Sequence, residues 1–308
     1  MSLRNLVTKH AVVAFAVTAV VGVTLAATLS ASAASPAASS RPKPVFRGAR
    51  YLALGDSVPF GFRELNNPPA PDYTNPNSLV GFPELVARDL GLKLTNAACP
   101  GETTGSMISL KRQSNGCWTN ADGSPGYRQT FPLHVKYRGS QLNFAVKWLK
   151  HHPNTRLVTL MIGANDGFLC QERTPDHCTS PKELDAVLAR VRNNVEQILQ
   201  RLRQGARYAG QIVIVWYYSL DYADPNQSAL ALALDHALAQ GRESIPNVRL
   251  AFGYRLFKRA AAQAGGNTCR AGLLTILKNA STPCGVHPSF DGQALLASAV
   301  ERRVAIKS

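Results

Sequence analysis

Short apolar segments alternate along the chain with longer segments in which apolar residues recur every three or four positions. The short segments have the length of strands, and five of them occur, at 51–55, 93–99, 156–163, 211–218 and 247–252. The longer segments are typical of helices, at 81–92, 141–152, 181–202, 229–244 and 292–305. Apolar strands that alternate with helices indicate a parallel sheet covered on both faces. We therefore predict an α/β fold, a three-layer α/β/α sandwich around a central, mainly parallel five-stranded sheet.

Polar residues gather where these predicted strands end. Gly55-Asp56-Ser57 closes the first strand, ACPGETTG (98–105) follows the second, GANDGF (163–168) follows the third, and GVHPSFDG (285–292) precedes the last helix. A sheet of this kind forms its ligand crevice at the carboxyl ends of its strands. Any one cluster could be a turn followed by a helix cap. Together they offer the residue types of an acyl-transfer site.

The four clusters resemble the successive blocks of the GDSL family, also called SGNH hydrolases. The order GDS…G…GxND…HP extends from Gly55 to Gly292, almost the whole of the predicted domain. The G-x-S-x-G elbow of ordinary α/β-hydrolases is absent around Ser57. The resemblance implies a flavodoxin-like SGNH hydrolase fold and an esterase or lipase activity.

The chemistry of the residues assigns two roles. Ser57 is the candidate nucleophile, which needs an adjacent base to take its proton. His287 is the candidate base, because imidazole titrates near neutral pH and can later protonate the leaving alkoxide.

The resemblance adds the supporting groups. It implies an oxyanion hole made of the Ser57 and Gly101 backbone N–H groups and the Asn165 side-chain amide. Asp56 and Asp166 resemble the accompanying acids of the family, which we expect to support the geometry of the site.

One position departs from the family pattern. The family places an aspartate three residues before its histidine, whereas this chain has Cys284 there and no acid between Ala280 and His287. We expect a backbone carbonyl near Pro283 or Cys284 to accept the Nδ1 hydrogen of His287, which would leave a Ser–His dyad. A carboxylate such as Asp291 at Nδ1 would contradict this expectation.

The chain has six cysteines, for which 15 pairings are possible in principle. We predict the pairs Cys99–Cys117, Cys170–Cys178 and Cys269–Cys284, because each pair brackets a short loop that contains Gly, Pro or Asn. The CxxC and HxxxH spacings of zinc sites are absent. We expect no metal and no cofactor, since Ser–His chemistry needs neither.

The first fifty residues have the composition of an export signal and a linker. Arg4 and Lys9 precede an apolar run from Ala11 to Leu29, and Ala31-Ser32-Ala33 follows as a small-x-small cleavage pattern. We predict a signal peptide at 1–33, a Pro/Ser/Ala-rich linker at 34–48 and the hydrolase domain at 49–308. An uncleaved N-terminal anchor is the alternative. The expected location is extracellular.

The net charge of +15 favours contact with an anionic membrane or cell-wall surface, although a solvated surface explains most of the charges. Basic runs interleaved with aromatic residues are absent, so we do not expect nucleic acid as a partner. We expect a monomer.

The substrate is expected to be a lipid ester or a short acyl ester. Loops 60–79 and 112–138 could form the rim of the site, with Trp118, Tyr127 and Phe131 as candidate apolar contacts. Two alternatives are an acetyl esterase that acts on acetylated polysaccharide, which a shallow aromatic-lined crevice would favour, and a catalytically silent cell-surface binding protein on the same scaffold.

Overall fold

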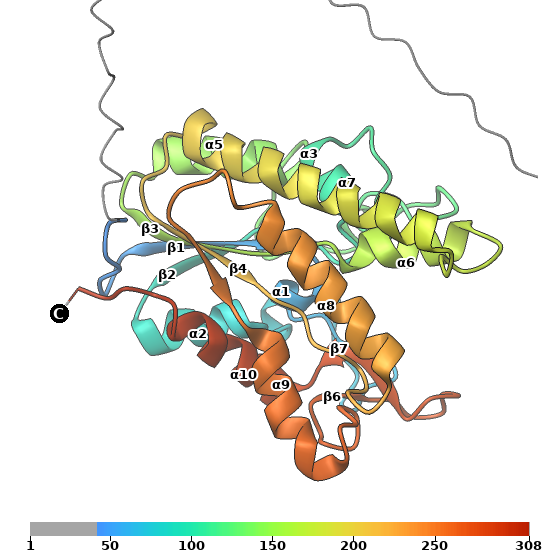
Figure 1. Ribbon diagram of the computed structural model, residues 1–308. Helices are drawn as coiled ribbons and strands as arrows, with labels where there is room; N and C mark the ends of the chain where they lie inside the picture. Colours follow the sequence, from blue (N-terminus) through green and yellow to red (C-terminus); the bar gives the residue numbers. More distant parts are fainter. Residues whose placement is uncertain (1–41, 308) are drawn as a thin grey trace, which may run out of the picture. The chain divides into compact units, whose positions relative to one another are not determined.

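Five parallel strands form the central sheet of the computed structural model, which describes residues 42–307 (Figure 1). In spatial order the strands are β2-β1-β3-β4-β5, and every neighbouring pair is parallel. Their bounds are Arg50–Gly55 for β1, Lys93–Asn96 for β2, Thr155–Met161 for β3, Gln211–Val215 for β4 and Val248–Ala251 for β5. The five strands and the three-layer α/β architecture expected from the sequence are confirmed.

Helices cover both faces of the sheet. Figure 1 shows α5, α7 and α6 above the sheet and α2, α9 and α10 below it. The long helices are α2 (Phe82–Leu90), α5 (Gln141–His151), α6 (Ala164–Arg173), α7 (Pro181–Gln200), α8 (Pro225–Gln240), α9 (Gly253–Ala261) and α10 (Phe290–Glu301). Shorter helical turns are α1 (Ser57–Phe60), η1 (Pro76–Ser78), α3 (Thr104–Ile108), α4 (Tyr127–Thr130), η2 (Arg201–Gly205) and η3 (Ala262–Ala264). Buried Val187, Val191, Val195 and Ile198 of α7 follow the helical period that predicted this helix.

Helix ends differ from the predicted ones where a local signal stops the helix. The helix predicted at 81–92 ends at Leu90, because Gly91 adopts a left-handed conformation and caps it. The helix predicted at 292–305 begins earlier, at Phe290, because the side chain of Ser289 accepts the Gly292 N–H as an N-cap.

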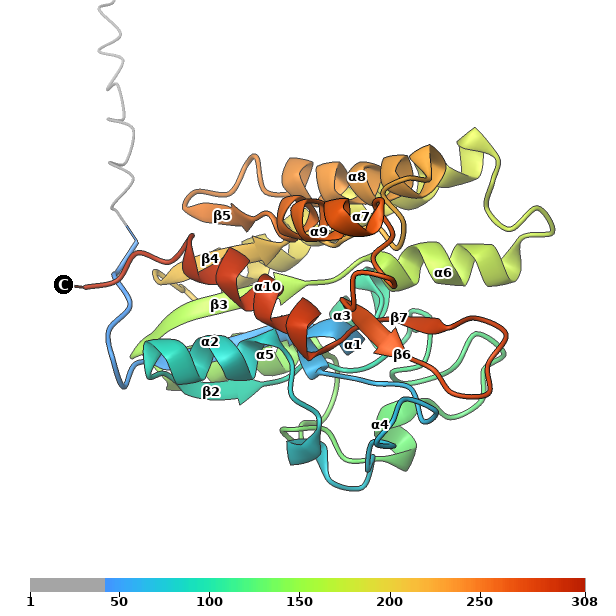
Figure 2. The ribbon, with the colours of Figure 1, turned by 90° about the horizontal axis from the view of Figure 1, so that it is seen from below.

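A small antiparallel hairpin lies outside the main sheet and was not predicted. It consists of β6 (Leu274–Ile276) and β7 (Cys284–Pro288), and Figure 2 shows it beside the carboxyl-terminal end of the central sheet. The two strands are too short for an apolar pattern to predict them. The hairpin matters for the site because His287 lies on β7.

The three disulfides are those predicted, Cys99–Cys117, Cys170–Cys178 and Cys269–Cys284. The last one joins β7 to the segment that precedes β6.

The segment just before β1 contacts the domain. The predicted signal peptide lies outside the described residues, but part of the predicted linker at 34–48 is described and packs on the domain. Val45 is buried, and it pairs with Ile306 in a parallel bridge. The side chain of Gln211, the first residue of β4, donates to the carbonyl of Lys43 and to that of Ala305. The two ends of the described chain therefore meet at the amino ends of the strands. Residues 42–307 all belong to one unit, and no helix among them combines the length and apolar character needed to cross a membrane.

Candidate active site

Strand β1 delivers Ser57 to the carboxyl edge of the sheet through a turn that only glycine can begin. Gly55 has a φ of +140°, and a Cβ on it would lie 1.9 Å from the carbonyl oxygen of Met161 on β3. Asp56 then caps α1, accepting the Val58 N–H at 3.0 Å. Ser57 is consequently the first residue of a short helix, and its own N–H makes no hydrogen bond to the described part of the chain.

The imidazole of His287 lies against the Ser57 hydroxyl. Its Nε2 is 2.9 Å from Ser57 Oγ. The β7 strand that carries it is held by the Cys269–Cys284 disulfide and by the Tyr218 hydroxyl, which donates to the Val286 carbonyl at 2.7 Å. The structure thus brings together the two residues expected to carry the chemistry.

The expectation that a backbone carbonyl orients His287 is wrong. The Nδ1 atom is 2.7 Å from Glu64 Oε1, on the loop that follows α1. The Glu64 carboxylate also accepts the Val286 N–H at 3.2 Å and the Thr275 hydroxyl at 2.6 Å. Gly285 makes room for it, since a Cβ there would lie 2.0 Å from Glu64 Oε1. A carboxylate therefore occupies the position opposite Nδ1, and the site contains a Ser–His–Glu arrangement in place of a dyad.

Burial and hydrogen bonding act in opposite directions on Glu64. Partial burial raises the pKa of this carboxyl, but the hydrogen bond and charge of His287 and the Thr275 hydroxyl outweigh it and lower the pKa to about 2. Glu64 is thus an anion at neutral pH, as required to hold a proton on Nδ1.

Glu64 could not be identified from the sequence. It lies 223 residues before His287 and outside the four motif clusters. The one available signal is that it is the only acid between Ser57 and Pro71, within a loop that was expected to border the site.

Asn165 and Gly101, the expected oxyanion donors, are linked through Glu102. Asn165 is the second residue of α6, and its Nδ2 donates to the Glu102 carbonyl at 3.1 Å, which leaves the second N–H of the amide available. Asn165 lines the same cavity as Ser57 and His287, whereas Gly101 is not among the residues that line it. Gly101 has a φ of +75°, and a Cβ on it would lie 2.4 Å from the Asn115 carbonyl oxygen, so this position requires glycine. Its N–H has no hydrogen-bond partner within residues 42–307.

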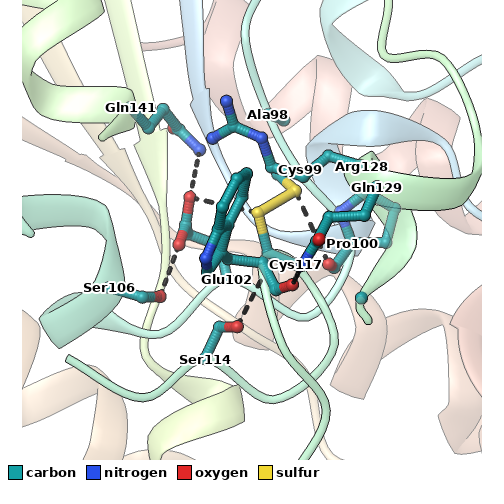
Figure 3. The surroundings of a disulfide bond; sticks show 12 residues. Ala98, Cys99, Pro100, Glu102, Ser106, Ser114, Cys117, Arg128, Gln129 and Gln141 are labelled. Carbon is teal, nitrogen blue, oxygen red and sulfur yellow. Dashed lines mark hydrogen bonds between the residues drawn. A yellow bond between two sulfur atoms is a disulfide. The ribbon is translucent and has the colours of Figure 1, made fainter. Parts of the chain in front are cut away.

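A buried carboxyl holds the turn that contains Gly101. Figure 3 shows Glu102 between Ser106 and Gln141, beside the Cys99–Cys117 disulfide. The Gln141 side chain also donates to the Gly55 carbonyl at 2.9 Å and accepts the Gly55 N–H at 2.7 Å. One side chain thereby connects the turn before Ser57 to the turn at Gly101. Burial raises the pKa of Glu102 to about 7.

Asp56 and Asp166 make hydrogen bonds around the site, and neither is hydrogen-bonded to the Ser57 hydroxyl. Asp56 accepts a hydrogen bond from the Tyr217 hydroxyl, and burial raises its pKa to about 6. Asp166 accepts the Thr104 N–H at 2.8 Å and the Thr104 hydroxyl at 2.7 Å. This pair of bonds joins α6, which carries Asn165, to α3.

An apolar cavity of about 370 Å³ opens at Ser57 and His287. It lies between α6, α7 and α8, and its apolar walls include Phe168, Leu184, Val187, Leu188, Leu230 and Leu234. The cavity therefore places apolar walls beside the Ser57 hydroxyl.

The loop aromatics expected to contact substrate do not line this cavity. Tyr127 and Phe131 pack against Phe60, Phe62 and Tyr73 in a separate cluster. Phe62 alone of this cluster reaches the catalytic groups, with its ring 4.9 Å from that of His287. Loop 60–79 thus borders the histidine, and helices form the cavity.

Two groups of potential metal-ligating atoms occur in the described chain, Cys99, Glu102 and Cys117, and Cys170, Cys178 and Glu183. In each group the two sulfurs are joined in a disulfide and lack the thiolate charge that binds a metal. Each is left with a single carboxylate.

Solved structures with the same fold include esterases and lipases. Phospholipase A1 from Streptomyces albidoflavus NA297 has a TM-score of 0.52 and 16% identity, with 83% of this chain and 100% of that chain covered. A lipase from a goat rumen metagenome has a TM-score of 0.52 and 16% identity, with 84% of this chain and 99% of that chain covered. A catalytic mutant of an acetylxylan esterase from Geobacillus stearothermophilus has a TM-score of 0.50 and 15% identity, with 86% of this chain and 98% of that chain covered.

No curated protein sequence matches the chain. The family model of the GDSL-like lipases and acylhydrolases matches residues 53–295, a span that begins just before Ser57 and ends just after His287. The chain is therefore a carboxylic ester hydrolase of the GDSL-like lipase/acylhydrolase family.

Proposed function

We propose that the chain is a serine esterase that cleaves carboxylic esters with an apolar acyl chain. In this proposal Ser57 and His287 are the catalytic residues, and Glu64 positions the histidine. The observation that carries it is the pair of hydrogen bonds from Ser57 Oγ to His287 Nε2 (2.9 Å) and from His287 Nδ1 to Glu64 Oε1 (2.7 Å), at the opening of an apolar cavity.

The reaction follows from this geometry in two halves. His287 Nε2 accepts the Ser57 proton as Oγ attacks the ester carbonyl carbon, and it then donates that proton to the leaving alkoxide, which leaves an acyl group on Ser57. Water, deprotonated by the same Nε2, attacks the acyl group, and the proton returns to Ser57 Oγ as the carboxylic acid departs. Glu64 remains ionised throughout and fixes the hydrogen on Nδ1.

The negative charge that forms on the carbonyl oxygen needs donors near Ser57. We assign this role to the free N–H groups of Ser57 and Gly101 and to the second N–H of the Asn165 amide. Loss of one such donor typically lowers turnover by about 10²–10³.

The shape of the cavity favours a hydrocarbon chain over an acetyl group. The cavity of about 370 Å³ lies within the range of about 300–1,000 Å³ that is typical of small-molecule pockets, which is more room than an acetyl group needs. Its walls are mainly aliphatic side chains of α7 and α8, whereas the acetyl esterase alternative called for a shallow, aromatic-lined crevice.

We also propose that the enzyme acts outside the cytoplasm. Three disulfides within residues 42–307 are typical of oxidising compartments, and the sequence of residues 1–33 has the pattern of an export signal. The monomeric state stays a prediction.

The experiment is hydrolysis of p-nitrophenyl esters of graded acyl length by residues 39–308 and by their Ser57→Ala variant. We expect activity on medium-chain esters that the variant lacks.

A second pair of variants tests the cavity. Ala231→Phe, which fills the cavity, should move the preferred ester toward shorter acyl chains. Ala186→Phe, on a cavity on the other side of α7, is the matched control and should leave the preference unchanged. A preference for acetate in the parent protein would favour the acetyl esterase alternative, and equal activity in Ser57→Ala would reject the mechanism.

A further inference from the structure

Large hydrophobic side chains are exposed around the opening of the cavity at Ser57. Nine such side chains are exposed within residues 42–307. Three of them, Phe168 on α6, Leu230 on α8 and Val286 on β7, line the cavity itself. The apolar lining of the cavity therefore continues onto the surface on three sides of its opening.

Two further exposed side chains lie on segments that are hydrogen-bonded to the β6–β7 hairpin or belong to it. The Val286 N–H donates to Glu64, whose neighbour Leu65 is 63% exposed. Asn67 Nδ2 donates to the carbonyl of Ile276, which lies on β6 opposite β7 and is 58% exposed. These contacts place Leu65 and Ile276 beside the strand that carries His287. We call Leu65, Phe168, Leu230, Ile276 and Val286 the apolar rim.

The segments that carry Leu65, Ile276 and Val286 are almost free of charged side chains. Residues 65–71 contain no charged side chain, and residues 274–286 contain only Lys278. Charged residues make up 17% of the whole chain and are mostly basic. These two segments therefore offer apolar side chains and one cation, which are complementary to a lipid surface that bears phosphate headgroups.

The opposite end of the domain provides a comparison. Phe46 and Ile306 are also exposed, at 37% and 56%, but they lie at the amino ends of the strands, where Val45 pairs with Ile306. Figure 1 shows the chain end at that side of the sheet and the β6–β7 hairpin at the other.

We propose that the apolar rim is a docking surface for the phosphate-bearing surface of a lipid aggregate, a micelle or bilayer, from which an acyl chain passes directly into the cavity. The inference rests on the proposed function, since it assigns a source to the acyl chain of that site. Docking would place the leaving-group side of an ester at the headgroup level, with Lys278 close to the phosphates. Transfer of the apolar rim side chains from water to the interface supplies the binding free energy.

The test measures binding to phosphatidylcholine vesicles, with and without phosphatidylglycerol, by co-sedimentation. All proteins comprise residues 39–308 and carry Ser57→Ala, so that the vesicles are not consumed and binding is measured independently of catalysis. We expect the parent to bind both vesicles, more tightly when phosphatidylglycerol is present. Leu65→Ser combined with Ile276→Ser should weaken binding by about tenfold or more.

Phe46→Ser combined with Ile306→Ser is the matched control and should bind as the parent does. With Ser57 restored, the rim variant should retain hydrolysis of a dissolved short-chain ester while losing activity on the same ester class in micelles. A second rim variant, Leu230→Ser, reports on the α8 side of the opening and should also weaken vesicle binding, which keeps the proposal testable where the first variant does not fold.

Three results would overturn the proposal. The first is a parent protein that binds neither kind of vesicle, and the second is an equal weakening of binding in the rim and control variants. The third is binding that requires phosphatidylglycerol and is unchanged in the rim variants, which would indicate adhesion through net charge alone. Rim-dependent binding by a protein that hydrolyses no ester would reject the proposed function and leave the docking surface supported.

Discussion

At the residue scale, Glu64 changes the chemistry expected of this site. The family position for the acid is occupied by Cys284, which is used in a disulfide. The structure supplies the carboxylate from a different segment, the loop after α1. The acid and the histidine therefore come from distant parts of the chain and depend on the fold to meet.

Glu64→Gln tests this role. We expect kcat to fall by about 10²–10⁴, since the equivalent exchange in serine proteases costs about 10⁴ through the wrong tautomer. KM should change little, because Glu64 is not among the residues lining the acyl cavity. Asp291→Asn is the control, since Asp291 is an exposed acid close to His287 in sequence, and its activity should remain near that of the parent.

The pH dependence of stability gives an independent readout for Glu64. Its pKa in the folded protein, about 2, is below its ordinary value of 4.5, so the ionised form stabilises the fold above pH 4.5 and this stabilisation disappears as the pH falls toward 2. The destabilisation caused by Glu64→Gln should accordingly be larger at pH 7 than at pH 3 in urea unfolding. An identical loss at both pH values would contradict the assignment of a low pKa.

At the element scale, the turn at Gly101 depends on a buried acid. Glu102 joins this turn to α3 through Ser106 and to α5 through Gln141, and Gln141 holds the last residue of β1. The pKa of Glu102 is raised by burial to about 7, above the ordinary 4.5, so ionisation between these pH values opposes folding.

Glu102→Gln should remove the ionisation that opposes folding, while keeping a side chain of the same shape. The amide oxygen can still accept from Gln141, and the amide nitrogen can donate to Ser106. We expect the melting temperature of the variant, relative to the parent, to rise between pH 5 and pH 8. A difference that does not change with pH would show that Glu102 does not titrate in this interval.

The elements also show how far sequence reasoning extends. The apolar runs of β1, β3 and β4 and the period of α7 were sufficient to predict the sheet and its layers, because burial of a whole face leaves a pattern in the sequence. The motif clusters placed Ser57 and His287 at the site, because the carboxyl ends of parallel strands meet at one edge.

What could not be predicted lies in loops and short strands. The contact between Glu64 and His287 joins residues 223 positions apart and depends on the conformation of an irregular loop that no periodic pattern describes. The cavity between α6, α7 and α8 depends on how side chains of three helices pack. For the same reason Tyr127 and Phe131, which the sequence made candidates for substrate contact, pack against other loop aromatics.

At the scale of the whole molecule, two of the three disulfides close loops that differ in what they anchor. Cys269–Cys284 closes a loop of 15 residues and anchors the hairpin of His287. Cys170–Cys178 closes a loop of 8 residues at the connection between α6 and α7.

Removing the first of these disulfides should impair both stability and activity. We expect Cys269→Ser with Cys284→Ser to lower the free energy of unfolding by about 3 kcal/mol and to reduce ester hydrolysis at temperatures where the protein remains folded, because β7 is released at one end. Cys170→Ser with Cys178→Ser is the matched control, with a smaller loss of stability and near-normal hydrolysis. Unfolding in urea and initial rates measure the two effects, and equal loss of activity in both variants would refute the anchoring role of Cys269–Cys284.

The pairing of Val45 with Ile306 has a practical consequence. Both ends of the described chain leave the domain at the amino ends of the strands, while Ser57 and His287 lie at the carboxyl ends. An affinity resin, a fluorescent fusion partner or a solid support joined at either end would face away from the cavity. Enzyme immobilised through Lys43 or Lys307 would then present its nucleophile outward, toward the liquid that carries the substrate.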